Sequence, residues 1–202
     1  MKEYYDTRAP EYDEWYLGIG KFAERDRPGW EEEVAALERA VARLPPARTL
    51  DVACGTGFLT RRLRGEITAL DQSERMLEIA GERLAQATLV QGEALELPFD
   101  DRAFDRVFTG HFYGHLEGRD RNRFINQARR LAGELVVVDS ALRPDHDPCE
   151  HQRRVLNDGS EFEVYKRYFD AGRLAAELGG GTVLHAGQWF VMVSSLASAT
   201  AR

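Results

Sequence analysis

The chain has 202 residues, of which 43% are hydrophobic and 30% charged, so it holds enough apolar material for one sizeable core and is not a disordered chain. Its 34 acidic and 27 basic side chains give a net charge of −7. An acidic protein has no long-range attraction for phosphate backbones or anionic lipid, so we expect neither nucleic acid nor a membrane as partner. The two cysteines make no disulfide framework, which favours a reducing cytoplasm.

Helical and strand patterns alternate over the middle of the chain. Apolar residues recur at helical spacing over 29–44, and Pro45-Pro46 ends that helix. The patterns that follow predict strands at 49–53, 67–70, 88–90, 106–109 and 134–139, and helices at 58–63, 73–85 and 120–131. Strands that alternate with helices are typical of right-handed crossovers and a largely parallel sheet covered on both faces.

The C-terminal part departs from this alternation. After a predicted helix at 171–178, two apolar runs at 182–185 and 189–196 are separated by only three residues, too few for a crossover helix. We therefore expect an antiparallel hairpin there. The predicted fold is a single α/β domain over residues 1–202, with a Rossmann-like, doubly wound sheet of seven strands, mostly parallel, and helices on both faces. Residues 141–168 show neither the helical nor the strand spacing of apolar residues, and we expect a lid-like loop insertion there.

The strongest local signal is the segment from Asp51 to Gly57, Asp-Val-Ala-Cys-Gly-Thr-Gly, directly after the first strand. Gly55 and Gly57 allow a tight turn and close approach to a ligand. Asp51 suits a cationic amine better than a phosphate, and Asp71 ends the next strand, where such folds bind ribose hydroxyls. The alternatives are a bare strand-to-helix connection or a dinucleotide site, although the third glycine of G-x-G-x-x-G is missing.

At these residues the chain resembles the class I S-adenosylmethionine-dependent methyltransferases of the small-molecule type. TLDVACGTG is similar to the family's first motif, ALDQS to the second, and QGEALELPFDDRAFDRVF to the third and fourth. The resemblance covers about residues 45–140 and implies S-adenosylmethionine as cofactor. The cofactor-binding residues that it implies, together with one from the leader described below, are Tyr12, Asp51, Ala53, Cys54, Gly55, Gly57, Asp71, Gln72, Met76, Glu93, Ala94 and Gly110.

The resemblance also implies roles for these residues. Asp51 and the turn that follows it would face the methionine end of the cofactor, and Asp71 would bind the ribose. Gln72, Glu93 and Ala94 would lie beside the adenine, and Met76 would supply an apolar face. Two positions depart from the commonest family pattern, because Ala53 replaces a Gly and Glu93 replaces an Asp.

Residues 1–28 form a predicted N-terminal leader. Its Tyr5-Asp6 and Tyr12-Asp13 pairs resemble the YD-x-x-A-x-x-YD leader of small-molecule methyltransferases, which folds over the cofactor. Aromatic rings near a sulfonium are physically reasonable, because a cation is attracted to a ring quadrupole. The alternative is a helix that packs its Tyr and Trp residues into the core. We favour a cofactor contact for Tyr12.

Two histidines follow the fourth strand, at the mouth where open α/β sheets bind ligands. Imidazole titrates near neutrality, so His111 or His115 could remove a proton from the acceptor. His115 also matches a His often found there in the family, and we expect it to be the general base. Alternatively, His111 packs on the cofactor and His115 caps a helix. We expect no metal, because the close spacing from His146 to His151 lacks the rigid ligand set that zinc needs.

The expected function is in-line methyl transfer to an O or N nucleophile of a small molecule, by a monomer or homodimer. No Ser-His-Asp or Cys-His arrangement is evident in the sequence, and none is required, because the sulfonium already activates the methyl group. The alternatives are an RNA or protein methyltransferase, a non-catalytic S-adenosylmethionine-binding protein and a nicotinamide dehydrogenase.

Overall fold

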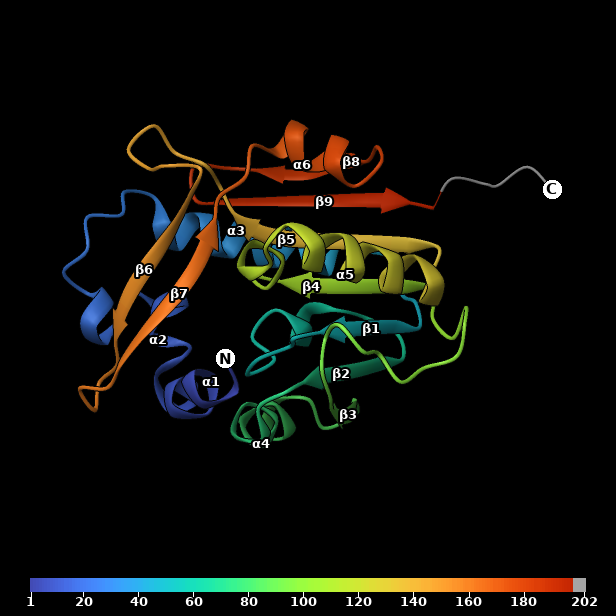
Figure 1. The fold of residues 1–202 in the computed structure, drawn as a ribbon, viewed down its shortest axis with the longest axis horizontal. Coiled ribbons are helices and arrows are strands. Elements are labelled where there is room, and N and C mark those ends of the chain that lie inside the picture. Colours follow the sequence, from blue (N-terminus) through green and yellow to red (C-terminus); the bar gives the residue numbers. More distant parts are fainter. Residues whose placement is uncertain (198–202) are drawn as a thin grey trace.

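A seven-stranded sheet forms the centre of the structure, a computed structural model that describes residues 1–197. Its strands are β1 (Thr49–Val52), β2 (Ile67–Asp71), β3 (Thr88–Gln91), β4 (Arg106–Gly110), β5 (Glu134–Ser140), β8 (Thr182–Ala186) and β9 (Phe190–Leu196). They lie in the order β3–β2–β1–β4–β5–β9–β8 (Figure 1). Strands β1 to β5 are parallel, whereas β9 is antiparallel to both β5 and β8. The predicted doubly wound fold and its antiparallel C-terminal hairpin are confirmed.

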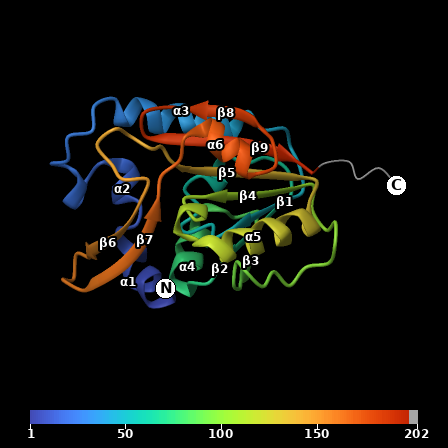
Figure 2. The same cartoon turned by 45° about the horizontal axis from the view of Figure 1, so that its top comes forward.

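Helices cover both faces of this sheet (Figures 1 and 2). The helices are α1 (Lys2–Arg8), α2 (Glu14–Leu17), α3 (Trp30–Ala42), α4 (Glu74–Arg83), α5 (Gly118–Leu131) and α6 (Ala171–Glu177). Successive side chains of a strand point to opposite faces, and β5 shows the consequence. Leu135 and Val137 pack with α5 and α6, while Val136 and Val138 pack with α3. An uninterrupted apolar run is therefore the sequence signature of this central strand.

Two segments differ from the sequence prediction. The predicted helix at 58–63 is only a 3-10 turn at Thr60–Arg62. The predicted loop at 141–168 contains two antiparallel strands, β6 (Cys149–Val155) and β7 (Glu161–Arg167), which form a separate hairpin. The half-buried positions of β6 carry polar side chains, so no alternation of apolar residues marked the strand. The Asn-Asp-Gly-Ser turn at 157–160 is a hairpin signal that could have revealed it.

The β6–β7 hairpin and the leader pack together at the carboxyl ends of the parallel strands (Figure 1). Tyr4 of α1 is buried in one small cluster with Leu156 and Val164, and its ring lies 5.3 Å from that of Phe162. At the tip of the hairpin, Asn157 donates its backbone N–H to a carboxylate oxygen of Glu11 over 2.6 Å. Segments about 150 residues apart in the chain thus meet over one edge of the sheet.

Within residues 1–197, no helix combines the length and the apolar character that a membrane crossing requires.

Candidate functional site

Two adjoining cavities lie at the carboxyl ends of the parallel strands. The first, called here the strand-end cavity, is lined by Met1, Tyr5, Tyr12, Ala53, Gly55, Leu70, Asp71, Gln72, Gly92, Glu93, Ala94, Leu95, Gly110, His111, Phe112 and Leu116. The second, called the hairpin cavity, has a volume of about 780 Å³ and lies between the leader and the β6–β7 hairpin. The two cavities share Tyr5, Tyr12 and His111 in their walls and therefore adjoin each other at these three side chains.

The turn after β1 has the backbone that its glycines predict. Gly55 and Gly57 have φ of 55° and 74°, in the left-handed region that glycine adopts without strain. A Cβ on Gly57 would lie 2.8 Å from a Leu84 methyl carbon, so this glycine is needed for packing against α4. Ala53 is also left-handed, with φ of 59°, which explains physically why glycine is the commoner residue at this position.

Asp71 is held at the wall of the strand-end cavity by backbone donors. One carboxylate oxygen accepts the N–H of Gly55 over 2.8 Å, and the other accepts the N–H of Ser73 over 2.9 Å. Burial raises the pKa of Asp71, although these backbone bonds act in the opposite direction. The carboxylate is therefore fixed between the first turn and the start of α4, where both oxygens keep free lone pairs for a ligand.

In the two Tyr-Asp pairs of the leader, the tyrosines and the aspartates have different contacts. Tyr5 and Tyr12 line the strand-end cavity. Asp6 accepts the Ser73 hydroxyl over 2.6 Å at the start of α4. Asp13 accepts the Thr56 hydroxyl over 2.5 Å and also pairs with Arg83 over 2.6 Å. The aspartates thus tie the leader to the β1 turn and α4, and the tyrosines close the cavity.

Asp51 lies behind the turn and does not reach the cavity wall. It is 2% exposed, and one oxygen accepts the Thr60 hydroxyl over 2.6 Å. Its other oxygen has no hydrogen-bond partner among residues 1–197. Burial raises the pKa of Asp51 to about 7. A cationic ligand group nearby would favour the ionised carboxylate by its charge.

The structure brings most of the predicted cofactor residues together, but not all of them. Tyr12, Ala53, Gly55, Asp71, Gln72, Glu93, Ala94 and Gly110 line the strand-end cavity. Asp51, Cys54, Gly57 and Met76 do not. Met76 lies in the first turn of α4 with its side chain fully buried, and it offers no face to the cavity. The apolar wall instead comes from Leu70, Leu95, Phe112 and Leu116, which sequence reasoning missed although they flank the motif residues.

Of the two candidate catalytic histidines, His111 is buried and His115 is half-buried. Nδ1 of His115 lies 2.7 Å from the carbonyl oxygen of Tyr165, and since a carbonyl only accepts, this nitrogen carries the proton. Burial lowers the pKa of His115 well below its usual value and that of His111 to about 3. Neither ring nitrogen of His111 has a hydrogen-bond partner among residues 1–197, although Nδ1 lies 4.0 Å from a carboxylate oxygen of Asp139. The His111 ring packs 4.8 Å from that of Trp15. Burial therefore opposes a titration of these imidazoles near neutrality, and the general-base role of His115 stays a prediction.

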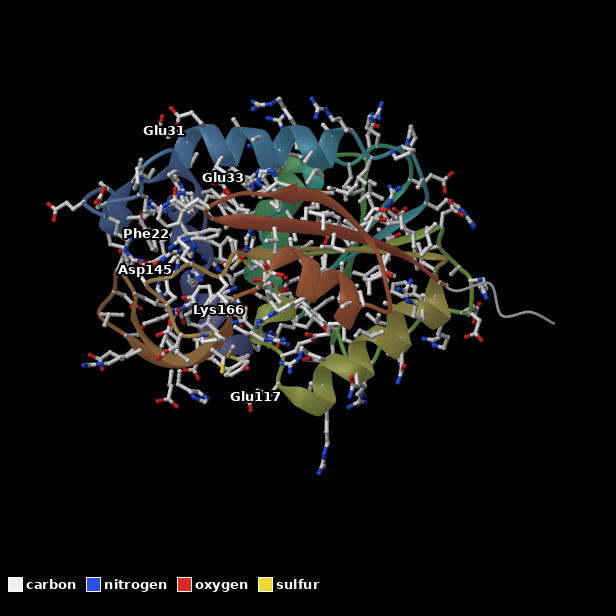
Figure 3. The ribbon with its side chains drawn as sticks, turned by 90° about the horizontal axis from the view of Figure 1, so that it is seen from above. Phe22, Glu31, Glu33, Glu117, Asp145 and Lys166 are labelled. Atoms are coloured by element: carbon white, nitrogen blue, oxygen red, sulfur yellow. The ribbon has the colours of Figure 1, made fainter. Side chains whose placement is uncertain are left out.

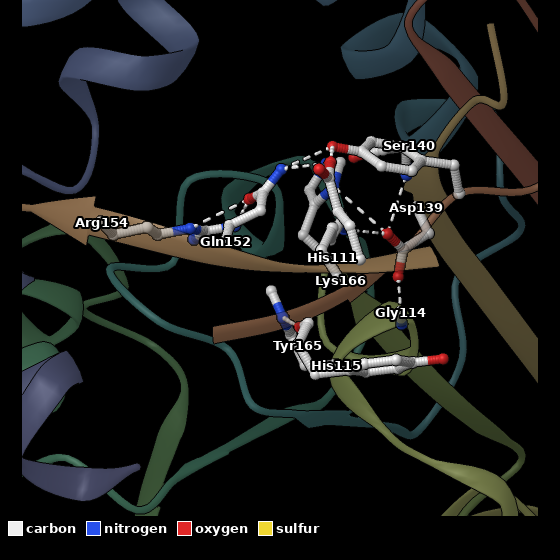
Figure 4. Close-up of polar contacts among 11 residues, drawn as sticks. His111, Gly114, His115, Asp139, Ser140, Gln152, Arg154, Tyr165 and Lys166 are labelled. Atoms are coloured by element: carbon white, nitrogen blue, oxygen red, sulfur yellow. Dashed lines mark hydrogen bonds and ion pairs between the residues drawn. The ribbon is translucent and has the colours of Figure 1, made fainter. Parts of the chain in front are cut away.

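A buried ion pair lies beside these histidines (Figure 4). Asp139, at the end of β5, accepts the Lys166 ammonium of β7 over 2.5 Å and the Gly114 N–H over 2.7 Å. Burial alone would raise the pKa of Asp139, but the Lys166 charge outweighs it and the pKa is lowered. This pair links β5 to the hairpin. Two sequence features could have indicated this ion pair. Asp139 is an acidic residue near the end of an apolar strand, and Lys166 is a basic residue in a segment where buried and exposed positions alternate.

In the part of the chain that the structure describes, no three His, Cys, Asp or Glu side chains gather in a way that could hold a metal ion. The ring of His146 instead stacks on that of Tyr168, with 4.7 Å between their centroids.

Comparisons with known proteins agree with this geometry. Residues 49–133 match the family model described as a methyltransferase domain. A demethylmenaquinone methyltransferase of Thermotoga maritima is 36% identical over 118 residues, which is 54% of this chain and 49% of that protein. A Staphylococcus aureus protein of the same name is 46% identical over 72 residues, 31% of this chain and 30% of its own length. The chain thus spans half or less of the curated relatives that it matches.

Solved structures extend the likeness over nearly the whole chain. The complex of DhpI with SAH is 29% identical, with a TM-score of 0.69 over 95% of this chain and 92% of that one. The DhpI–SAM–HEP complex, at 24% identity and a TM-score of 0.72 over 95% and 94% of the two chains, shares the fold. The matched family segment contains the glycine turn, Asp71 and Glu93, and the fold places them around one cavity. Residues 49–133 are therefore similar to a methyltransferase domain, and nearly the whole chain is similar to a protein solved in complex with SAH.

Proposed function

We propose that this protein transfers a methyl group from S-adenosylmethionine to an O or N nucleophile of a small molecule. The observation that carries the proposal is the strand-end cavity, where Asp71 and the glycine turn face the leader tyrosines. The names of the curated relatives and the SAH and SAM complexes of DhpI support the reaction class. The adjoining cavity of about 780 Å³ supports a small-molecule acceptor, because ligand pockets of this size usually bury whole small molecules.

The residues present fit this cofactor. Asp71 would accept ribose hydroxyls, Gln72 and Glu93 would lie beside the adenine, and the apolar cavity wall would cover the adenine faces. Asp51 lies behind the turn, so its carboxylate would act on the cofactor's cationic amino group by its charge and not by lining the cavity. When bound, S-adenosylmethionine supplies a methyl group on a cationic sulfur, and the acceptor's lone pair bonds to that carbon as the carbon–sulfur bond breaks.

The chain's own contribution is to align the reactants and exclude water. The aromatic rings of Tyr5 and Tyr12 form the boundary between the two cavities, where the two reacting groups would meet. His111 lies at the same boundary. These three side chains would therefore surround the transferred group, and the tyrosine faces favour a positive charge.

We propose that His115 orients the acceptor side of the site and is not an obligatory general base. Its proton sits on Nδ1, so Nε2 is free to accept one. However, an imidazole with a pKa far below neutrality is a weak base, and proton transfer is most effective when the pKa lies near the working pH. Alignment would therefore supply most of the rate, and a proton released by the acceptor would leave to water.

A screen of small phenols, amines and carboxylic acids tests this proposal. We expect at least one compound to gain a methyl group in place of a hydrogen, with equal formation of S-adenosylhomocysteine. Asp71→Ala should slow the reaction, whereas Arg123→Gln on the far, exposed side of α5 should not. If the protein binds S-adenosylhomocysteine but methylates none of these compounds, the alternative of a non-catalytic cofactor-binding protein is favoured.

A further inference from the structure

The hairpin cavity is positively charged although the whole chain is acidic. Eight lysines and arginines but only four aspartates and glutamates line it, against a net charge of −7 for the chain. Figure 3 shows that the labelled Phe22, Asp145 and Lys166, from three separate segments, gather at the end of the molecule where this cavity lies. A local excess of cations in a recess concentrates anions there.

Several of these cations already have carboxylate partners. Lys21 pairs with Glu11 over 2.9 Å. The other three paired cations are Arg143 with Asp145, Arg153 with Glu161 and Lys166 with Asp139. In each pair the carboxylate neutralises the cation, so these four cations attract an anionic ligand only weakly.

Four arginines of the cavity differ from these. Within residues 1–197, Arg8, Arg25, Arg27 and Arg154 form no ion pair with a carboxylate. The guanidinium of Arg27 donates instead to the backbone carbonyl oxygens of Trp15 and Phe22. Arg8 is only 9% exposed, and its guanidinium donates to the Tyr4 hydroxyl over 2.7 Å. Buried charges are normally paired, so an unpaired buried guanidinium needs an explanation.

Two of these arginines, Arg8 and Arg154, are held close together by neutral groups. The Tyr4 hydroxyl that accepts from Arg8 also accepts from Arg154 over 2.8 Å. Arg154 is fixed further by the side-chain oxygen of Gln152 over 2.8 Å (Figure 4). Arg25 lies at the exposed rim of the cavity, where partial loss of water contacts and the nearby charges of Arg154 and Arg8 lower its pKa. Three like charges therefore face one space, an arrangement that an anion would stabilise.

A structural role alone explains only part of this arrangement. The Arg8 guanidinium lies 4.7 Å from the centre of the Tyr12 ring, and that contact helps to hold the leader over the glycine turn. Arg25 is exposed and stacks on Phe22 at 4.7 Å, without a polar partner. Arginine forks bind carboxylate and phosphoryl oxygens with two parallel hydrogen bonds. In Arg154, Nε and Nη2 donate to the side-chain oxygen of Gln152 and Nη1 donates to Tyr4, which leaves one further N–H on each terminal nitrogen for such a pair of bonds.

We propose that the methyl acceptor carries an anionic oxygen group, a carboxylate or a phosphoryl group, that Arg154 and Arg25 bind in the hairpin cavity. The inference rests on the proposed function, since it names the acceptor class of the same site. Arg8 lies beside Tyr12, at the boundary with the strand-end cavity, and adds its charge to the same space. The anion would thus anchor the acceptor at the hairpin while its nucleophile points past Tyr5 and Tyr12 toward the donor.

Calorimetry on the protein saturated with S-adenosylhomocysteine tests this inference. The probes are benzoate, phenyl phosphate and uncharged benzyl alcohol at constant ionic strength, since the cavity walls include Trp15, Trp30 and Trp189, which suit a benzene ring. We expect at least one of the two anions to bind one site per chain, at least about tenfold more tightly than benzyl alcohol. Which anion binds better separates a carboxylate from a phosphoryl acceptor.

Two variants and a control complete the experiment. Arg154→Gln should weaken anion binding by about tenfold or more, and Arg25→Gln, at an exposed position that folding does not need, by about threefold. Arg123→Gln, whose guanidinium pairs with Glu96 outside the cavity, should change nothing. In all three, affinity for S-adenosylhomocysteine should stay within about twofold of wild type.

The outcomes separate this inference from the proposed function. If the wild type fails to bind S-adenosylhomocysteine, the proposed function itself is contradicted. If it binds that compound but prefers neither anion over benzyl alcohol, only the anionic acceptor is overturned. If Arg154→Gln and Arg25→Gln weaken the binding of S-adenosylhomocysteine and not that of the anion, the arginines bind the carboxylate of the cofactor. In that case the inference also fails.

Discussion

Asp71→Ala is expected to weaken the binding of S-adenosylhomocysteine by about 10- to 100-fold, because each hydrogen bond to a charged group contributes roughly 1.5–3 kcal/mol. In the proposed complex this carboxylate accepts ribose hydroxyls. It also accepts the backbone N–H groups of Gly55 and Ser73, so its removal loosens the turn that faces the cofactor. Isothermal titration calorimetry measures the change directly.

The matched control for this prediction is Asp105→Ala. Asp105 is exposed and pairs with Arg48 over 2.8 Å, away from the strand-end cavity. The control should bind S-adenosylhomocysteine as the wild type does, and both proteins should stay folded. An Asp71→Ala affinity unchanged within about twofold would place the ribose elsewhere.

Lys166→Met should lower the free energy of unfolding by about 3–5 kcal/mol, because it leaves the Asp139 carboxylate charged, buried and without its cation. Asp139 is fully buried and Lys166 is 5% exposed, so water offers little compensation. The Gly114 N–H bond to Asp139 would remain but cannot neutralise a full charge. Urea unfolding monitored by circular dichroism measures the loss.

Two further variants separate the buried pair from a general effect of losing a cation. The double variant Asp139→Asn with Lys166→Met should recover most of the lost stability, since Asn keeps an oxygen for the Gly114 N–H without a charge. Arg153→Met removes an exposed pair with Glu161 and should leave the free energy of unfolding nearly unchanged, because solvent screens such pairs. A cost of under about 1 kcal/mol for Lys166→Met alone would show that the pair contributes little.

The sheet could be predicted because each of its strands has a local signature. The apolar run of β5 is buried on both faces, and three residues between two apolar runs permit only a hairpin at the C-terminus. The glycine turn also has a local signature. Gly55 and Gly57 adopt positive φ angles, which other residues rarely adopt, so the glycines themselves indicate the turn.

The remaining features depend on contacts between distant segments. Asp6 and Asp13 bond to residues 67 and 70 positions away, so their anchoring role leaves no local pattern. The pKa of His111 is lowered because Trp15 and Phe190, from opposite ends of the chain, pack on its ring and bury it. Met76 is close in sequence to Asp71, but the turn into α4 directs its side chain into the core.

The most direct test of the central claim is a calorimetric titration of the wild-type protein with S-adenosylmethionine, S-adenosylhomocysteine and NAD. We expect the first two to bind one site per chain and to raise the melting temperature, because a ligand that binds only the folded state stabilises it by mass action. NAD should not compete, since the turn lacks the third glycine of a dinucleotide site. Binding of neither sulfur compound at millimolar concentration, or displacement of both by NAD, would contradict the account.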